Sequence, residues 1–208
     1  MVENMIVKDE ADSIETALTK IYAAQELFRR DRKKGLAQLN KLFRSGTVPK
    51  PSLNGRYQGE LIALDIAPGL TQFFEWTSSM WMPWLGKTFD ASRQSGDNIF
   101  TRDSYALARF FNPFYRGFVT EGSKTYRCFT FRTYTAPRLT DPDRTVLKID
   151  YDLKENPAGT IRRILDELVQ VDSNLYLGKA HAHWWTGGWQ TVAYFMLRSP
   201  ASETSDPT

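Results

Sequence analysis

The sequence has a single cysteine, Cys128, and only two histidines among its 208 residues. One cysteine excludes an internal disulfide framework and fits a reducing compartment. The first ten residues contain acids instead of the apolar core of a signal peptide, and no apolar run is long enough to cross a bilayer. We therefore expect a cytoplasmic protein without an integral membrane segment.

Several common catalytic motifs are also missing from the sequence. It has no phosphate-binding glycine loop, nucleophile elbow, Cys-x-x-Cys or His-Glu-x-x-His. These absences argue against nucleotide chemistry and the common hydrolases. The net charge is only +3, and the one dense basic run, residues 29–34, lies in a helical pattern. A solvated helix face explains that run better than nucleic-acid binding, so no nucleic-acid partner is expected.

Residues 1–50 are predicted to form a helical N-terminal arm. Apolar residues recur at helical spacing over residues 12–29, and a second short helix follows Gly35 and ends at Gly46. The prolines of residues 47–51 favour an extended linker. This arm is interpreted as a helical cover or lid, with the functional body following it.

From residue 51 the pattern becomes mainly that of strands. Alternating or glycine-bounded segments predict strands over residues 55–62, 84–90, 125–135, 145–152, 175–185 and 189–197. Helices are predicted over residues 65–82 and 103–111, with a polar loop at 91–98. The spacing of Ile161, Ile164, Leu165 and Leu168 predicts another helix, after Asn156-Pro157. Residues 186–188 indicate a hairpin turn.

These elements favour a mainly β protein, an antiparallel barrel with N-terminal helices and a helix before the C-terminal hairpin. The barrel domain is expected over residues 51–198, and residues 199–208 are expected to be a disordered tail. A barrel of about eight strands has room for side chains or one small ligand. An α+β sheet with helices on one face is the alternative.

Residues 40–90 contain a family-like pattern. Its parts are Leu42-Phe43, Val48-Pro49, Gly55-x-Tyr57-x-Gly59 and Trp84-x-Gly86-Lys87-x-Phe89-Asp90. The pattern resembles the GXWXG family of uncharacterised bacterial proteins, with Tyr57 in place of the family's tryptophan. More loosely, it is similar to the calycin group, which includes lipocalins and nitrobindin. The resemblance implies a barrel that encloses a cavity; it transfers no catalytic residue.

The two histidines form a row with a lysine in the strand predicted over residues 175–185. Side chains two apart share a face, so Lys179, His181 and His183 lie on one side and small residues on the other. The row either points into a polar cavity or faces water. His-x-His could also bind a metal, with Asp150 or Asp152 as a further ligand, and the nitrobindin similarity implies haem as another alternative. The favoured prediction is that the protein has no cofactor.

A second ionisable row lies on the strand over residues 145–152. If it faces the cavity, Lys148 or Lys179 could bind a carboxylate, and Asp150 could act as a base. The alternative is an exterior ladder of salt bridges that contributes little stability.

The favoured function is binding of a small, largely apolar ligand that carries an acidic or carbonyl group. The predicted pocket walls are Phe73, Trp81, Trp84, Tyr126 and Tyr194; the predicted polar contacts are Arg132, Lys148, Lys179, His181 and His183. One alternative is an acid–base enzyme, such as an isomerase, cyclase or hydratase, in which Asp150 exchanges protons with His181 or His183. Another is a haem or metal protein that uses one of these histidines. Ligand identity and oligomeric state stay open.

Overall fold

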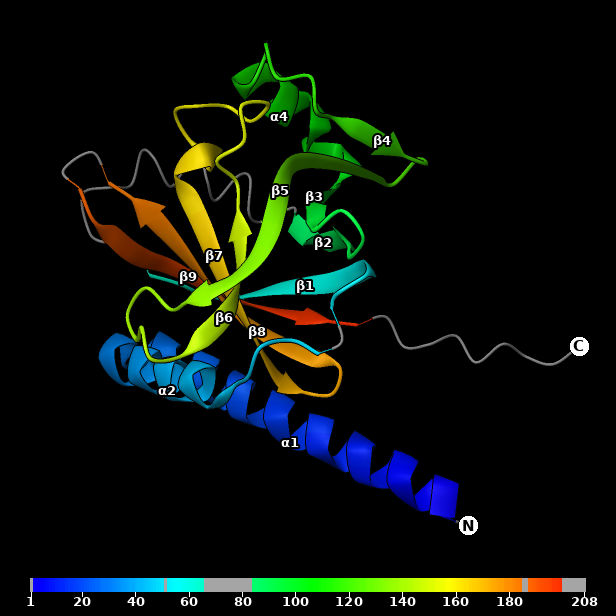
Figure 1. Cartoon of the computed structure of the whole chain (residues 1–208), viewed down its shortest axis with the longest axis vertical. Coiled ribbons are helices and arrows are strands. Elements are labelled where there is room, and N and C mark those ends of the chain that lie inside the picture. Colours follow the sequence, from blue (N-terminus) through cyan, green and yellow to red (C-terminus); the bar gives the residue numbers. More distant parts are fainter. Residues whose placement is uncertain (1, 51, 66–83, 185–186, 200–208) are drawn as a thin grey trace, which may run out of the picture.

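The computed structural model describes residues 2–50, 52–65, 84–184 and 187–199. Two N-terminal helices lead into an antiparallel β-barrel (Figure 1). Helix α1 is Val2–Arg30 and helix α2 is Arg32–Ser45. Asp31 separates them, and its side chain accepts a hydrogen bond from the Lys34 backbone N–H, which caps α2. The helical prediction for the N-terminal arm is confirmed over these ranges.

The barrel is a closed sheet of eight strands with a ninth at its side. The strands are β1 (Gly55–Leu64), β2 (Trp84–Asp90), β3 (Ser95–Thr101), β4 (Val119–Glu121), β5 (Thr125–Pro137), β6 (Thr145–Asp150), β7 (Ile164–Asp172), β8 (Leu175–His183) and β9 (Trp189–Arg198). Strands β1, β2, β3, β5, β6, β7, β8 and β9 pair in that order, β9 pairs with β1, and β4 adds only to β5. All pairs are antiparallel, so the predicted barrel is confirmed.

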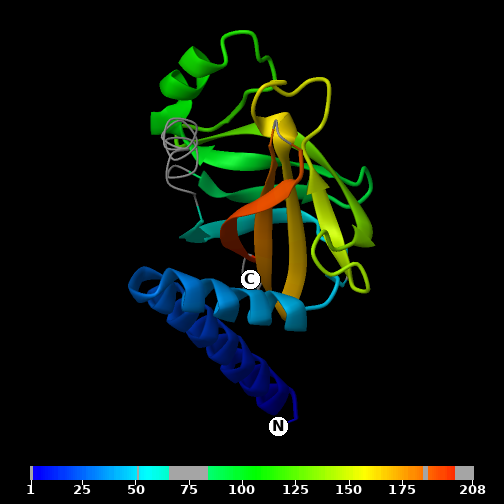
Figure 2. The same ribbon diagram turned by 90° about the vertical axis from the view of Figure 1, so that its left-hand side faces the viewer.

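The barrel has an aromatic interior and a covered outer face. Inside, the core contains rings such as Tyr57, Phe89 and Phe195. Outside, α1 and α2 pack on strands near Tyr194 and Met196 and bury a second apolar cluster. These helices lie at one end of the molecule, and α4 (Tyr105–Phe111) lies at the other, as two views at right angles agree (Figures 1 and 2). Several strands are therefore buried on both faces.

The glycines of the Gly55-x-Tyr57-x-Gly59 and Trp84-x-Gly86 segments allow β1 and β2 to approach closely. A Cβ atom at Gly59 would lie 2.4 Å from the Trp84 ring. Gly86 adopts a positive φ of 138°, and a Cβ atom there would lie 2.0 Å from the Tyr57 carbonyl oxygen. Only glycine fits these positions without displacing its neighbours. As a result, Trp84 folds across β1 towards the barrel interior.

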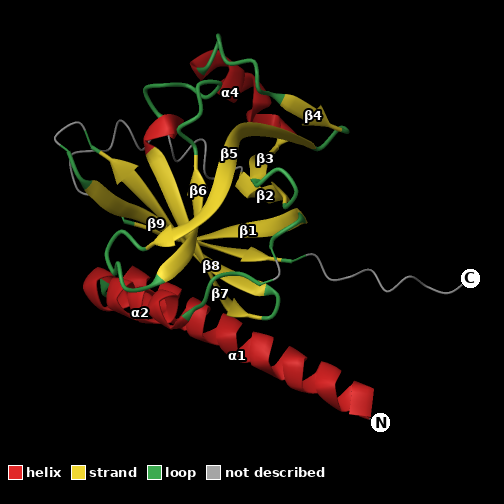
Figure 3. Cartoon of the chain, viewed as in Figure 1, coloured by secondary structure: helices red, strands yellow, loops and turns green. Residues whose placement is uncertain are grey.

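Two predicted elements differ from the structure. The predicted loop over residues 91–98 is wrong at its end, because β3 begins at Ser95. The predicted helix after Asn156-Pro157 is also wrong: Ile161–Arg163 forms one 3-10 turn, and Ile164–Asp172 is strand β7. Figure 3 shows helices only at the two ends of the described barrel. The helix predicted over residues 65–82 and the tail predicted over residues 199–208 lie almost wholly outside the described residues.

The short helical segment after β3 is confirmed, with a different start. A 3-10 turn, Arg102–Ser104, precedes α4, and no side chain caps either N-terminus. None of the described helices combines the length and the apolar character needed to cross a lipid bilayer.

Candidate ligand site inside the barrel

The row of Lys179, His181 and His183 lies on the outer face of β8. The opposite face belongs to the barrel core, where Ala180 and Ala182 are buried. A Cβ atom at Gly178 would lie 2.2 Å from the Phe195 ring, so the small residues make room for aromatic side chains inside the barrel. Lys179 and His181 are nevertheless only 2% and 1% exposed. The row is therefore neither in the cavity nor, at these two residues, in water.

Glu167 is the centre of this outer polar cluster. Its carboxylate accepts hydrogen bonds from Lys148 Nζ and, at 2.7 Å, from the Leu139 backbone N–H. His181 Nε2 lies 3.2 Å from Glu167 Oε2, and His181 Nδ1 lies 3.2 Å from Thr191 Oγ1. Burial raises the pKa of Glu167, but these partners outweigh burial and hold the pKa at about 2. Both ring nitrogens of His181 have protein partners.

Lys179 and Tyr194 contact helix α2. Lys179 Nζ donates to Asn40 Oδ1 at 2.6 Å, and the Tyr194 hydroxyl donates to the same oxygen at 2.8 Å. Lys179 Nζ also lies 4.4 Å from the centre of the Phe43 ring. Burial lowers the pKa of Lys179 to about 8. These two predicted ligand contacts thus fasten the helical arm to the barrel.

A groove of about 500 Å³ on the outer surface brings together Asp150, Asp152 and His183. Asp150 Oδ2 accepts from Arg132 Nη2 at 2.7 Å. The His183 ring packs against Trp189, with 5.0 Å between ring centres. The structure therefore places Arg132 and two of the three predicted catalytic residues on the outside, with His181 buried elsewhere.

The remaining predicted wall residues divide between the interior and the undescribed segment. Tyr126 is buried inside and stacks on Phe100 at 5.5 Å. Trp84 lines the interior cavity. Phe73 and Trp81 lie outside the described residues.

A different polar cluster occupies the barrel interior. It consists of Lys87 on β2, Asn98 on β3, Tyr151 directly after β6 and Asp166 on β7; each is at most 5% exposed, and all four line one cavity. Lys87 Nζ lies 3.0 Å from Asp166 Oδ2 and donates to Asn98 Oδ1 at 2.8 Å and to the Tyr151 hydroxyl. The Tyr151 hydroxyl in turn donates to Asp166 Oδ2 at 3.1 Å. Strands distant in the sequence thus converge on one ion pair.

Four aromatic rings surround the Lys87 ammonium. Its nitrogen lies 5.1 to 5.5 Å from the ring centres of Trp84, Phe131, Tyr151 and Phe195. Such contacts stabilise a cation out of water. Burial lowers the pKa of Lys87, and Asp166 opposes this. Burial raises the pKa of Tyr151 well above its ordinary value, and the Asp166 charge adds to the rise. The phenol therefore stays protonated and can donate a hydrogen bond.

This cluster borders a cavity of about 30 Å³. Its apolar walls are Trp84, Phe100, Phe129, Ile161, Ile164 and Phe195. That volume holds roughly one or two water molecules, so only a small chemical group fits between these side chains. Asp166 Oδ1 is buried and has no hydrogen-bond partner among the described residues. An unsatisfied carboxylate oxygen beside a polar cavity is costly, which indicates a place for a further donor.

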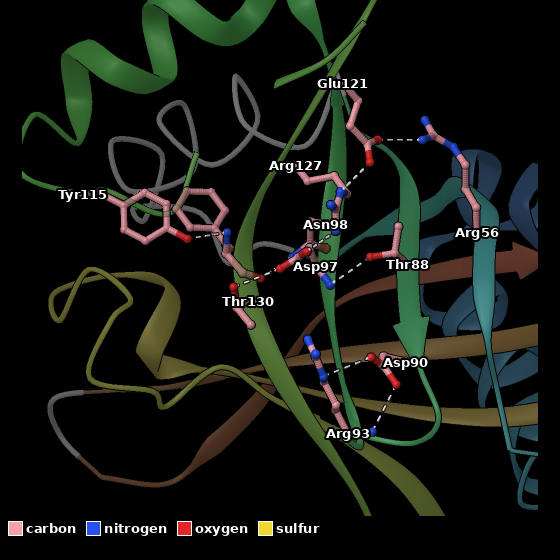
Figure 4. Close-up of polar contacts among 11 residues, drawn as sticks. Arg56, Thr88, Asp90, Arg93, Asp97, Asn98, Tyr115, Glu121, Arg127 and Thr130 are labelled. Atoms are coloured by element: carbon pink, nitrogen blue, oxygen red, sulfur yellow. Dashed lines mark hydrogen bonds and ion pairs between the residues drawn. The ribbon is translucent and has the colours of Figure 1, made fainter. Parts of the chain in front are cut away.

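A bulge in β5 shapes one wall of the cavity. Phe129 has a positive φ of 58°, a strained conformation for a residue other than glycine. The Tyr115 hydroxyl accepts from the Phe129 backbone N–H at 2.7 Å, and Asn98 Nδ2 donates to the Phe129 carbonyl at 3.2 Å. Figure 4 shows Tyr115, Asn98 and Asp97 around this bulge. Asn98 thus links the strained wall to Lys87.

Sequence reasoning missed this cluster, although one signal was present. Lys87 and Phe89 are two residues apart on β2 and so share a face, which places the lysine on the same inward side as a core phenylalanine. Asp166 was hidden by the helical interpretation of residues 161–168, and Asn98 by the loop predicted over 91–98.

The interior cluster has complementary chemistry. The Lys87 ammonium and the Tyr151 phenol donate to a ligand's carbonyl or carboxylate oxygen when that oxygen takes the place of one of their present acceptors, while the second Asp166 oxygen is free to accept a proton or a hydrogen bond. Among the described residues, no three histidine, cysteine, aspartate or glutamate side chains are grouped so that they could hold a metal ion.

No protein-family model and no curated protein matches the sequence. A solved structure described as a protein from Thermomonospora curvata is similar over 86% of this chain and 99% of its own. The identity is 15% and the TM-score 0.49, too low to support an argument about fold or function.

Proposed function

We propose that the barrel binds a small ligand through an acidic or carbonyl oxygen, at Lys87 and Tyr151. The observation that supports this most directly is the buried Lys87–Asp166 pair, with Tyr151 beside it, at an aromatic cavity. A buried ion pair is often no more stabilising than apolar residues of similar size, so its presence beside a cavity favours a role in recognition.

The cavity dimensions limit how the ligand binds. Only its polar group enters the space beside Lys87, and its apolar part contacts rings such as Trp84, Phe100 and Phe129. This arrangement keeps the ligand class expected from the sequence, a largely apolar molecule with an acidic or carbonyl group. The proposed polar contacts to the ligand are Lys87 and Tyr151, in place of Lys148 and Lys179, which the sequence predicts. The resemblance of residues 40–90 to the GXWXG family and to calycin barrels agrees with this proposal.

We also propose a cytoplasmic location, in line with the single buried cysteine.

Native mass spectrometry of the freshly purified full chain tests the proposal. The wild-type protein is expected to carry an added small-molecule mass that denaturation removes. The double variant Lys87→Met/Asp166→Leu replaces the ion pair by apolar side chains and is expected to lose that mass while staying folded. The matched control, Lys148→Met/Glu167→Gln, alters the other buried lysine–acid pair, on the outer face, and is expected to retain it.

Two outcomes would overturn the proposal. One is retention of the added mass by the Lys87→Met/Asp166→Leu protein. The other is that nothing co-purifies and that formate, acetate and acetone, added as probes, shift no amide signals of β2 or β7 in NMR spectra.

Acid–base catalysis is the second candidate for the same cavity. The unpartnered Asp166 oxygen lies beside a phenol and an ammonium, so a proton acceptor and two donors face one small volume. Once a ligand is identified, Asp166→Asn is expected to abolish its conversion and to preserve its binding. Equal conversion by Asp166→Asn and wild type would exclude this role.

A further inference from the structure

The surface of α4 exposes an unusual concentration of large apolar side chains. Leu107, Phe110, Phe111 and Phe114, here called the α4 patch, are 44%, 76%, 46% and 94% exposed. The first three recur at helical spacing and so share one face of α4. Exposed apolar groups scattered singly need no explanation, but four within eight residues form a surface that marks an interaction site.

Hydrogen bonds and an aromatic stack hold the segment that carries the α4 patch against the barrel. Asn112 ends α4, and its backbone N–H and its side-chain amide both donate to the Ala108 carbonyl at 3.1 Å. Tyr115 then turns inward and stacks on Phe129, with 5.3 Å between ring centres. The inward aromatic residues of this segment anchor it to the barrel, so the outward ones are held away from the core.

The charge of this segment is one-sided. Residues 105–118 contain two arginines, Arg109 and Arg116, both exposed, and no aspartate or glutamate. The nearest acids in the sequence are Asp103 and Glu121, and Glu121 pairs with Arg56 and Arg127. Glu155 lines a groove together with Phe111 and Phe114 and follows Lys154 in the sequence. The exposed side chains of the α4 patch therefore lie on a segment whose own charged residues are both arginines, one of which, Arg109, also lies over the Phe118 ring.

We propose that the α4 patch docks the protein on a membrane surface that contains anionic lipids. Aromatic and aliphatic side chains enter the boundary between headgroups and acyl chains, and nearby arginines are attracted to anionic headgroups. The patch lies on a helix and loop that project from the end of the barrel away from α1 and α2 (Figure 1). A projecting tip of this kind enters a fluid lipid layer without needing a matching groove.

Vesicle co-sedimentation of the full chain tests this inference. We expect the wild type to sediment with vesicles of phosphatidylcholine and phosphatidylglycerol in equal amounts, and much less with phosphatidylcholine alone. The variant Phe110→Ser/Phe114→Ser is expected to bind the anionic vesicles at least about tenfold more weakly, because each serine removes buried apolar area. Arg109→Gln/Arg116→Gln is expected to remove the preference for anionic vesicles.

Leu139→Ser is the matched control. Leu139 is also exposed and apolar, but it lies next to Arg138, whose guanidinium donates to the Gly46 carbonyl beside α2, at the other end of the molecule. Its vesicle binding should equal that of the wild type. Thermal unfolding checks that each variant is folded, and a loss of wild-type binding at high salt tests the charge contribution without any variant.

The inference fails if the wild type binds neither kind of vesicle or binds both equally. It also fails if the Phe110→Ser/Phe114→Ser variant binds anionic vesicles as well as the wild type does. A dimer in sedimentation velocity that this variant abolishes, together with no vesicle binding, would assign the patch to self-association instead.

Discussion

At the scale of single residues, the interior Lys87–Asp166 pair is a buried ion pair whose desolvation costs free energy of folding. Each charge is taken out of water, which costs several kcal/mol per ion before partners offset it. The offset comes from the 3.0 Å contact between them, from Asn98 and Tyr151, and from the surrounding rings. The pair is stable only as a pair, because either charge alone would be buried without compensation.

This dependence gives a prediction for the free energy of unfolding. Lys87→Met and Asp166→Leu are each expected to lower it by about 3–5 kcal/mol, because each leaves one buried charge unpaired. The double variant is expected to lose much less than the sum, and to equal or exceed the wild type. Urea unfolding of the four proteins measures this cycle. Losses that simply add would show that the two charges are not coupled.

At the scale of the element, β7 explains why the sequence pattern misled. The spacing of Ile161, Ile164, Leu165 and Leu168 is that of a helix face, yet residues from Ile164 onward are extended. The strand is buried on both sides, so apolar residues occur at both parities and the alternation of a half-exposed strand is absent. Its adjacent acids point to opposite faces: Asp166 reaches Lys87 inside, and Glu167 reaches Lys148 outside.

Strands that have polar residues or glycines at one end were predicted well. The predicted range of β2, residues 84–90, coincides with the structure, and the strands over 175–185 and 189–197 differ only at their ends. The candidate site was not predictable from these ranges. Three of its polar residues come from separate strands and the fourth directly follows another, and only the closed sheet brings Lys87, Asn98, Tyr151 and Asp166 together.

The outer acid of β7 gives a pH-dependent prediction. The pKa of Glu167 is about 2 in the folded protein, below its ordinary value of 4.5, so the folded state favours the charged form. Its contribution, about 3 kcal/mol, is fully present above pH 4.5 and is lost as the pH falls towards 2.

Urea unfolding of the wild type between these pH values is expected to show this loss, and Glu167→Gln is expected to show a correspondingly smaller pH dependence. Identical pH profiles for the two proteins would mean that other carboxylates cause acid unfolding.

At the scale of the whole molecule, helices α1 and α2 complete a core that the barrel alone leaves open. They bury Tyr194 and Met196 on the outer face, and Asn40 accepts hydrogen bonds from both Lys179 and Tyr194. Without these helices, apolar side chains would face water and Lys179 would lose its hydrogen-bond acceptor. The arm is thus an integral layer of the fold.

Removal of residues 1–46 is therefore expected to abolish cooperative folding or to cause aggregation, because the second core cluster would be exposed. Thermal unfolding followed by circular dichroism measures the effect. A truncated chain with an unchanged, cooperative transition would show that the barrel folds without the arm.

The pairing of β1 with β9 also governs when the barrel can form. These strands join residues from Gln58 to Arg198, almost the whole length of the barrel domain. During synthesis, β1 has no partner on that edge until β9 has emerged, so the barrel cannot close before then. Such non-local closure slows folding and leaves strand edges exposed to aggregation in the meantime. We therefore expect the Lys87–Asp166 pair to stay in contact with water until β1 and β9 pair and close the barrel.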